Sequence, residues 1–207
     1  MPVLAQTNYL TPEEYLALEA ESDVRHEYVN GEMLAMVGGT DWHNAIVFNM
    51  AVQLQPQTRP RDCRVLRESV KLRVERANAY FYPDVFVTCD KRDERDRLIK
   101  RHASVIVEVL SPSTEVIDRT SKFTAYRKLD SLLAYVLVET TYRRVEVYER
   151  QDHPFWRWSS LVAGEVARID TLDLAVAVDD LYVDTDVPSD SPVEQAADSR
   201  QHREVDS

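Results

Sequence analysis

A single acidic residue interrupts an apolar run of the sequence, Val105-Ile106-Val107-Glu108-Val109-Leu110. Such a run of β-branched and aliphatic residues is typical of a central strand covered on both faces. Because an ionised carboxylate buried there without a partner is costly, we expect a metal ion or a cationic side chain to compensate Glu108. A second acid, Asp84, opens the apolar run that follows Tyr82-Pro83. Two acids on neighbouring core strands are a common frame for a divalent cation, and together they favour a shared functional site.

Each acid also has a structural interpretation that leaves function aside. Glu108 can belong to a buried ion pair, and Asp84 can cap the turn after its proline. A third acid, Glu27, shares a strand face with apolar neighbours, so we predict that it joins the site. The alternative for Glu27 is an exposed strand edge. Glu32 lies next to a turn and is expected to be solvated.

A hydrolytic site also needs a cation to stabilise developing charge or to hold the nucleophilic water. Lys122 is the best candidate because it lies on the predicted helix just after the strand of the buried glutamate. Asp118 and Tyr126 lie one turn from it on the same helical face. The alternative for Lys122 is a surface lysine paired with Asp118. Lys71 competes for the same role from the polar face of an earlier strand.

His43 lies near the start of a predicted helix, where it can act as a base or bind phosphate. Its alternative role is that of a capping or packing residue. The sequence has no glycine-rich phosphate loop, no serine nucleophile elbow and no cysteine–histidine spacing that suits zinc. Metal-assisted hydrolysis is therefore the chemistry that these residues favour.

The elements that must position these residues follow from capping signals, hydrophobic periodicity and turn residues. Their order predicts a mixed α/β or α+β single domain. The predicted helices start at Thr11-Pro12, run from Asp41 to Gln55, and run from Val116 to Leu129, the last with Ile117, Phe123, Tyr126 and Leu129 facing inward. The predicted strands are a hairpin around Asn30-Gly31, then Cys63–Leu66, Ser69–Glu75, Asp84–Thr88, Ser104–Leu110, Ala134–Glu139, Arg144–Glu149, Trp156–Leu161 and Val166–Ile169. The charged segment from Asp90 to Arg101 is predicted to be a solvated loop or short helix.

The composition sets limits on the rest of the chain. Its 207 residues suffice for one domain with a real core, and we predict an extension at 1–10, the domain at 11–183 and an acidic disordered tail at 184–207. The net charge of −11 argues against a protein that coats nucleic acid, so any such contact must be local. Cys63 and Cys89 are too few and too far apart for a zinc site or a disulfide framework, so we expect buried thiols. We find no signal peptide and no apolar stretch of membrane-spanning length, and we predict a cytoplasmic protein.

At these residues the sequence resembles the Uma-two family, bacterial proteins described as "putative restriction endonucleases" with a PD-(D/E)XK nuclease-like core. The resemblance spans Thr11 to Tyr182. It is carried by the segments His26–Glu32, Tyr82–Val85, Val107–Thr114, Asp118–Lys122 and Tyr126-Arg127. The stretch from Glu108 to Thr114, followed by Asp118, Arg119 and Lys122, is its most specific part.

The resemblance implies a restriction-endonuclease-like core, with a central mixed β-sheet flanked by helices and extra antiparallel strands. It also implies a Mg²⁺ ion, which Mn²⁺ can replace, held by Asp84 and Glu108 with Glu27 as the acid of the first segment. The nuclease superfamily pattern places a lysine two residues after the glutamate, where this chain has Leu110. The family pattern moves the lysine to the following helix, which matches Lys122.

We therefore predict a Mg²⁺-dependent endonuclease that hydrolyses DNA phosphodiester bonds, with Asp84, Glu108 and Lys122 as its catalytic residues. The rival interpretation is a non-catalytic nucleic-acid-binding or assembly module on an inherited nuclease fold, which the acidic charge and the displaced lysine motivate. A third interpretation is a structural ion-pair network. The aromatic late strands around Trp156 and Trp158 predict a homodimer.

Position alone also predicts the geometry of the site. Glu108 should point the same way from its strand as Ile106 and Leu110, and it should lie within reach of Asp84. Two carboxylates that share one ion lie ~4–5 Å apart, and acids that close raise at least one pKa. Lys122 should approach the same spot from the helix that follows.

Overall fold

The first helix and hairpin form where the sequence supplies their signals. The structure is a computed structural model that describes residues 9–36, 38–152 and 154–191. Helix α1 (Pro12–Glu21) starts at a complete capping box, in which Thr11 Oγ1 accepts from the Glu14 N–H and the Glu14 carboxylate accepts from the Thr11 N–H. Strands β1 (His26–Val29) and β2 (Glu32–Ala35) turn at Asn30-Gly31, where both residues have positive φ as a type I′ turn requires. The predicted capped helix and hairpin are both confirmed.

A six-stranded mixed sheet forms the centre of the molecule, in the order β11-β10-β9-β8-β6-β3. Its central strands β8 and β9 are parallel, and every other neighbouring pair is antiparallel. Its members are β3 (Arg64–Arg67), β6 (Val85–Thr88), β8 (Ala103–Val109), β9 (Ala134–Val138), β10 (Arg144–Arg150) and β11 (Trp156–Val162). All residues of β6, β8 and β9 are buried, as expected for strands covered on both faces.

A second, five-stranded sheet has the order β2-β1-β5-β4-β7, and a two-stranded sheet pairs β12 with β13. The elements not yet bounded are β4 (Lys71–Val74), β5 (Ala79–Phe81), β7 (Ile99–Lys100), β12 (Val166–Ile169), β13 (Leu174–Ala177) and α5 (Val178–Leu181). Short 3₁₀ turns lie at η1 (Arg59–Arg61), η2 (Glu75–Ala77), η3 (Lys91–Glu94) and η5 (Asp170–Leu172). Sequence patterns did not predict β5, β7, β13 or α5.

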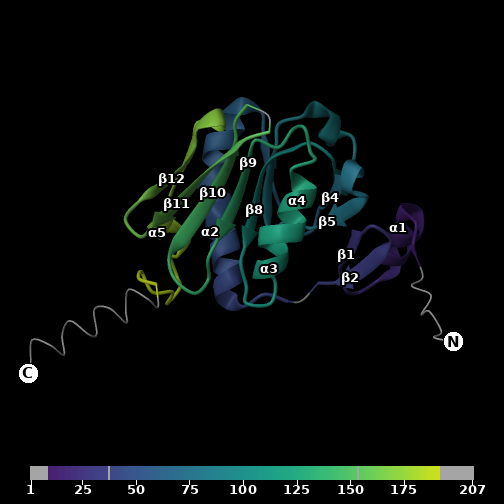
Figure 1. Cartoon of the computed structure of the whole chain (residues 1–207), viewed down its shortest axis with the longest axis horizontal. Coiled ribbons are helices and arrows are strands. Elements are labelled where there is room, and N and C mark those ends of the chain that lie inside the picture. Colours follow the sequence, from purple (N-terminus) through teal and green to yellow (C-terminus); the bar gives the residue numbers. More distant parts are fainter. Residues whose placement is uncertain (1–8, 37, 153, 192–207) are drawn as a thin grey trace, which may run out of the picture.

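Helical layers cover both faces of the six-stranded sheet (Figure 1). Helix α2 (Asp41–Thr58) packs on one face through Ile46, Met50 and Leu54, together with β12, β13 and α5. On the other face lie α3 (Glu115–Ile117), a π-helical turn (Asp118–Lys122) and α4 (Phe123–Tyr126), next to the five-stranded sheet. The predicted α/β class with a mixed sheet flanked by helices is therefore confirmed.

One local prediction is wrong and another is only partly right. The helix expected from Val116 to Leu129 is not one continuous α-helix, because a π-helical turn interrupts it and α4 ends at Tyr126, and Ile117, predicted to face inward, is exposed. The segment from Asp90 to Arg101 does contain a short 3₁₀ helix and is largely exposed, as predicted, but it also contributes strand β7 and buries the side chains of Asp93 and Lys100. Both buried side chains are hydrogen-bonded, which is how polar groups are accommodated away from water.

The expectation of free thiols is also wrong, because Cys63 and Cys89 form a disulfide. The two residues flank the antiparallel pair β3–β6, whose register ends with Arg64 opposite Thr88. The two cysteines are far apart in the sequence, and their proximity depends on the pairing of β3 with β6, which the spacing of the cysteines does not reveal. Both residues are half-buried.

The two ends of the chain are only partly described. Residues 1–8 of the predicted extension and 192–207 of the predicted tail lie outside the described residues. Before that point the chain stays packed on the domain, since Val187 is buried and its carbonyl accepts from Arg143. Within the described ranges, no helix combines the length and apolarity needed to cross a membrane.

Candidate functional site

Glu108 lies in the middle layer of the molecule, near the end of β8, with 2% of its surface exposed. Its neighbours along the strand, Ile106 and Leu110, pack in the cluster that contains Tyr126. The Tyr126 hydroxyl donates a hydrogen bond of 2.8 Å to Glu108 Oε1. Glu108 thus points to the same side as Ile106 and Leu110, as its position in the strand predicted.

Lys122 is the cation beside this buried glutamate. Its Nζ lies 3.3 Å from Glu108 Oε1, 3.1 Å from Glu27 Oε1 and 3.2 Å from Asp118 Oδ1. The lysine is 8% exposed, so its charge is largely removed from water together with those of its partners. The lysine expected from the following helix therefore does reach Glu108, and it is not a surface residue.

Asp84 is interlocked with Glu108 through the backbone. The Asp84 N–H donates to Glu108 Oε2 at 3.3 Å, and the Val109 N–H donates to Asp84 Oδ2 at 2.7 Å. Pro83 stands just before β6, where its missing N–H removes no ladder bond. Glu27 joins from β1 and accepts from the Tyr82 N–H at 3.3 Å. Glu27 and Glu108 thus meet at Lys122, and Asp84 is linked to Glu108 through the backbone. Within the described residues, the set of three donors that lie within 4.8 Å of one another is Asp84 with His43 and Glu68, and not the predicted trio of acids.

Burial controls the protonation of this cluster. Burial raises the pKa of Glu108 well above its usual value, and the charge of Asp84 adds to that rise while Lys122 opposes it. The pKa of Glu27 is raised as well, chiefly by burial. Burial alone would lower the pKa of Lys122, but the surrounding carboxylates outweigh it and raise that pKa well above the ordinary lysine value. Lys122 is consequently a permanent cation at neutral pH.

A π-helical turn positions the lysine. Asp118 and Lys122 stand at its two ends; both side chains are buried, and Lys122 joins Asp118 to Glu108. The carbonyl of Asp118 accepts from the Tyr135 hydroxyl at 3.0 Å, which fixes the turn to strand β9. Single π-turns inside helices are frequent at functional sites. The predicted grouping of Asp118, Lys122 and Tyr126 on one face holds, although the helix is irregular.

His43 reaches the site from the other face of the sheet. Its Nε2 lies 3.3 Å from Asp84 Oδ2. Burial lowers the pKa of His43, but the hydrogen bond and the charge of Asp84 outweigh it, so the pKa is raised. Thr40 caps α2 by accepting from the His43 N–H, which sets the imidazole at the first turn of the helix.

Glu68 is the residue of this region that sequence reasoning missed. It lies in the turn between β3 and β4 at positive φ, and its N–H donates to the Pro83 carbonyl at 3.1 Å. One donor atom from each of His43, Glu68 and Asp84 lies within 4.8 Å of the other two. An acid in a polar turn carries no sequence signal of its own, so only the fold could identify Glu68.

The donor set suits a divalent cation. Carboxylate oxygens are the ligands that Mg²⁺ prefers, and imidazole extends the range to transition metals such as Mn²⁺. Lys122 and Tyr126 contact Glu108 Oε1, whereas Oε2 faces the backbone of Asp84. A carboxylate oxygen on the Asp84 side of Glu108 is therefore held without a cationic partner in the described part of the chain, and the residues present fit such an ion.

The competing lysine candidate lies apart from this cluster. Lys71 Nζ lies over the Tyr82 ring, 5.2 Å from its centroid, and burial lowers its pKa. No ion pair joins Lys71 to Glu108 among the described residues. Glu32 is exposed on the hairpin, as expected.

Known proteins resemble this chain over most of its length. The Uma2 family model, described as "Putative restriction endonuclease", matches residues 12–179. Two uncharacterized proteins of Synechocystis sp. are 34% and 31% identical to it, over 84% and 82% of this chain and 91% and 97% of their own lengths. The crystal structure of a "putative nuclease belonging to DUF820" from Anabaena variabilis shares the fold, with a TM-score of 0.70 at 19% identity, covering 84% of this chain and 97% of the other. The chain belongs to the Uma2 family.

Proposed function

We propose that this protein is a Mg²⁺-dependent endonuclease that hydrolyses phosphodiester bonds of DNA. The observation that carries the proposal is the interlocked pair Asp84 and Glu108, with Lys122 Nζ 3.3 Å from the glutamate. Family membership supports nuclease chemistry in general. The metal, the DNA substrate and the residue roles are proposals of ours.

Asp84 and Glu108 would hold the ion, with Glu27 as the third predicted acid and His43 and Glu68 as further donors on the Asp84 side. A divalent cation bound there would polarise the scissile phosphate and lower the pKa of a bound water. Lys122 keeps its charge because three carboxylates surround it, so it can stabilise negative charge that develops beside Glu108.

The position of the lysine supports a site of the nuclease type. Leu110, which occupies the place of the superfamily lysine, is buried and packs in the apolar cluster. Lys122 supplies the ammonium from the π-helical turn instead. A lysine can move along the chain without loss of function when its charge still reaches the same carboxylate, because a compact ammonium needs position more than direction.

The direct test is cleavage by the purified full chain. Plasmid and short duplex DNA are incubated with Mg²⁺ or Mn²⁺ and, in parallel, with a chelator. We expect nicking that requires the metal and that disappears in Asp84→Asn and in Glu108→Gln. Glu32→Gln, which alters an exposed acid on the hairpin, should cleave like the parent chain.

Cleavage no greater than that of the Asp84→Asn chain would refute the nuclease proposal. Thermal melting in Mn²⁺ and in chelator then separates the other two interpretations, because a ligand that binds only the folded state raises the melting temperature. DNA or metal binding without turnover would favour the non-catalytic binding module. A Glu108→Gln chain that is destabilised equally with and without metal would favour a structural ion-pair network.

The homodimer stays a prediction. In its favour, β11 is an edge strand of the six-stranded sheet, and Trp158 within it and Phe155 just before it are 57% and 68% exposed. Exposed aromatic residues on an unpaired strand edge are a common feature of protein–protein interfaces. Trp156 is only half-buried, but it packs against Phe123 within its own chain.

A further inference from the structure

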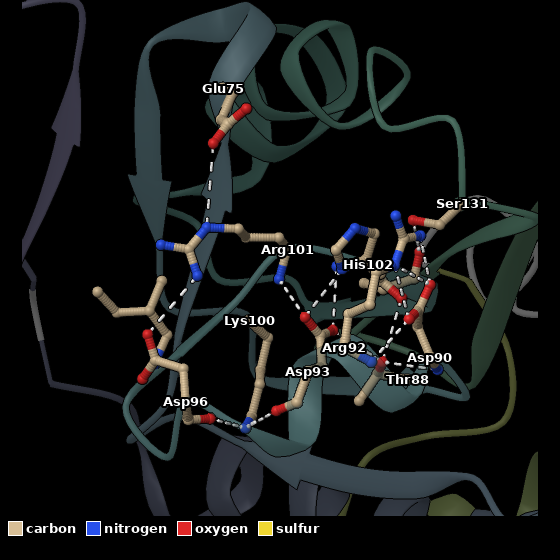
Figure 2. A network of polar contacts seen from close by, with 12 residues as sticks. Glu75, Thr88, Asp90, Arg92, Asp93, Asp96, Lys100, Arg101, His102 and Ser131 are labelled. Carbon is tan, nitrogen blue, oxygen red and sulfur yellow. Dashed lines mark hydrogen bonds and ion pairs between the residues drawn. The ribbon is translucent and has the colours of Figure 1, made fainter.

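A cleft of about 560 Å³ lies at the opposite end of β8 from Glu108. Its walls come from the ends of β4 and β8, from the turn that follows β6 and from the segment after α4. The lining residues are Arg73, Glu75, Arg76, Asp90, Arg92, Arg101, His102, Lys128, Leu129, Asp130 and Ser131. Figure 2 shows part of this wall, with Arg92, Arg101 and His102 among the labelled side chains.

Cations outnumber acids in this cleft, although the whole chain has a net charge of −11. Five of the lining residues are arginine or lysine and three are aspartate or glutamate. Two of the acids are already taken up, Asp90 by Arg92 at 2.6 Å and Asp130 by Arg76 at 2.7 Å. A local positive surplus in an acidic protein is a feature that favours an anionic ligand.

Two of the cations have no carboxylate partner among the described residues, and a third is held only by long ion pairs. Arg101 pairs with Asp96 at 3.6 Å and with Glu75 at 3.9 Å, both longer than a hydrogen bond. Arg73 stacks over the Tyr80 ring at 4.4 Å, and its Nη1 is buried without a hydrogen-bond partner. Lys128 is exposed and has no side-chain hydrogen bond or ion pair within the described ranges.

A buried framework fixes the wall that carries Arg101 and His102. The Asp93 carboxylate, 4% exposed, accepts from the N–H groups of Arg101 and His102 at 2.9 and 3.0 Å and contacts His102 Nδ1 at 3.0 Å (Figure 2). Lys100 Nζ donates to the carbonyls of Asp93 and Asp96. Because Nδ1 of His102 is engaged with Asp93, Nε2 is the ring nitrogen that remains for a ligand. Such preorganisation reduces the ordering cost of binding.

We propose that this cleft binds a phosphate-bearing ligand, either a free nucleotide or the backbone of a nucleic-acid strand. Guanidinium groups match phosphate oxygens in geometry and charge, and a mobile lysine can follow them. The volume lies in the range of small-ligand sites. The proposal does not rest on the cleavage chemistry, because six strand residues, roughly 20 Å, separate His102 from Glu108.

The test is isothermal titration calorimetry of the full chain in chelator, with inorganic pyrophosphate and with a 5′-phosphorylated oligonucleotide as separate probes. The parent chain should bind at least one of them. The double variant Lys128→Glu, Arg101→Gln should bind about tenfold or more weakly, since it loses charge-assisted hydrogen bonds. Arg97→Glu, a charge reversal at an exposed residue that does not line the cleft, should bind like the parent chain.

The probes identify the source of the phosphate. Pyrophosphate binding alone supports a free nucleotide, and tighter, strongly salt-dependent oligonucleotide binding supports a nucleic-acid strand. The proposal is overturned if neither probe binds at millimolar concentration or if the double variant binds as the parent does. Lys128→Glu alone carries the test if the double variant does not fold. Asp84→Asn should bind each probe as the parent chain does, which separates this proposal from the proposed cleavage.

Discussion

Lys122 is one cation shared by three buried or half-buried carboxylates, those of Glu27, Glu108 and Asp118. Such a cluster is stable only as a whole, because each charge that loses its partner is left in a medium of low polarity. Tyr126 supplies one further hydrogen bond to Glu108. The lysine is therefore important for stability as well as for the proposed chemistry.

Replacing Lys122 by methionine should destabilise the fold by about 3–5 kcal/mol at neutral pH, the usual cost of leaving buried charge uncompensated. The loss should grow with pH. In the folded state the pKa of Glu108 and that of Glu27 are already raised. Their contribution to the free energy of unfolding is therefore fully present at low pH, where both acids are protonated, and is lost as the pH rises through those pKa values. Without Lys122 both pKa values rise further. Urea unfolding at about pH 5 and about pH 8 measures the difference.

Lys91→Met is the matched control, because Lys91 also pairs with an acid, Asp62 at 3.6 Å, but both side chains are exposed to solvent. That change should alter the unfolding free energy by less than about 1 kcal/mol at either pH. An equally small effect of Lys122→Met would contradict the shared-cation description.

Among individual residues, the sequence identified most clearly those whose charge contrasts with the apolar residues around them. Glu108 could be singled out because a charge stands inside an apolar run, and Asp84 because it opens a second one. Lys122 could be singled out from its place on the helix that follows the strand of Glu108, and the family resemblance then matched it. Glu68 could not be found, since its approach to Asp84 depends on a positive-φ turn that follows β3.

Among the elements, the start of α2 is the one that sets the position of His43. Thr40 caps the helix, and the backbone of Gly39 lies against the imidazole. A Cβ at Gly39 would lie 2.7 Å from His43 Nδ1, closer than real contacts allow, so the ring would have to move. At Gly38 a Cβ would meet nothing within 4 Å.

Gly39→Ala should therefore displace His43 from Asp84 and reduce the rise in melting temperature that Mn²⁺ produces in the parent chain. Gly38→Ala should leave that rise unchanged. Differential scanning fluorimetry in Mn²⁺ and in chelator compares the two. Equal metal-induced shifts in both variants would remove His43 from the proposed donor set.

The helix after β8 shows where pattern reasoning at this level ends. Its apolar residues predicted a regular helix from Val116, but a π-helical turn places Asp118 and Lys122 at the cluster while Ile117 becomes exposed. Periodicity assumes one residue spacing throughout, so it cannot report a turn of different width. The inward positions of Phe123, Tyr126 and Leu129 were nevertheless predicted correctly, although the regular α-helix there spans only Phe123–Tyr126.

For the whole molecule, the sequence predicted the α/β fold class and the core strands, but not the division of the described strands into three separate sheets. Strands β6 and β8 were recognisable from their continuous apolar runs. Strand β7 has two residues and depends on a parallel pairing with β4, which no local pattern encodes. The pairing of Cys63 with Cys89 was missed for the same reason, since it follows from the β3–β6 register.

This disulfide should contribute about 3–4 kcal/mol to stability through the 26-residue separation that it closes in the unfolded chain. Urea unfolding with and without a phosphine reductant measures the contribution. The double variant Cys63→Ser, Cys89→Ser should have a lower free energy of unfolding than the oxidised parent, and the reductant should not change it. A parent chain whose stability does not respond to reduction would show that the bond does not form.

Strands β3 and β6 are joined at one end by this bond, and their other ends lead into Glu68 and directly follow Asp84. The redox potential of the solution, which decides whether this bond is formed, therefore also affects how rigidly the two candidate metal donors Glu68 and Asp84 are held. Oxidation of the two thiols by an external two-electron oxidant, with release of two protons, would tie the two strands together and so favour the metal-binding geometry. By the reciprocity of linked equilibria, a bound cation would in turn make the cysteines easier to oxidise.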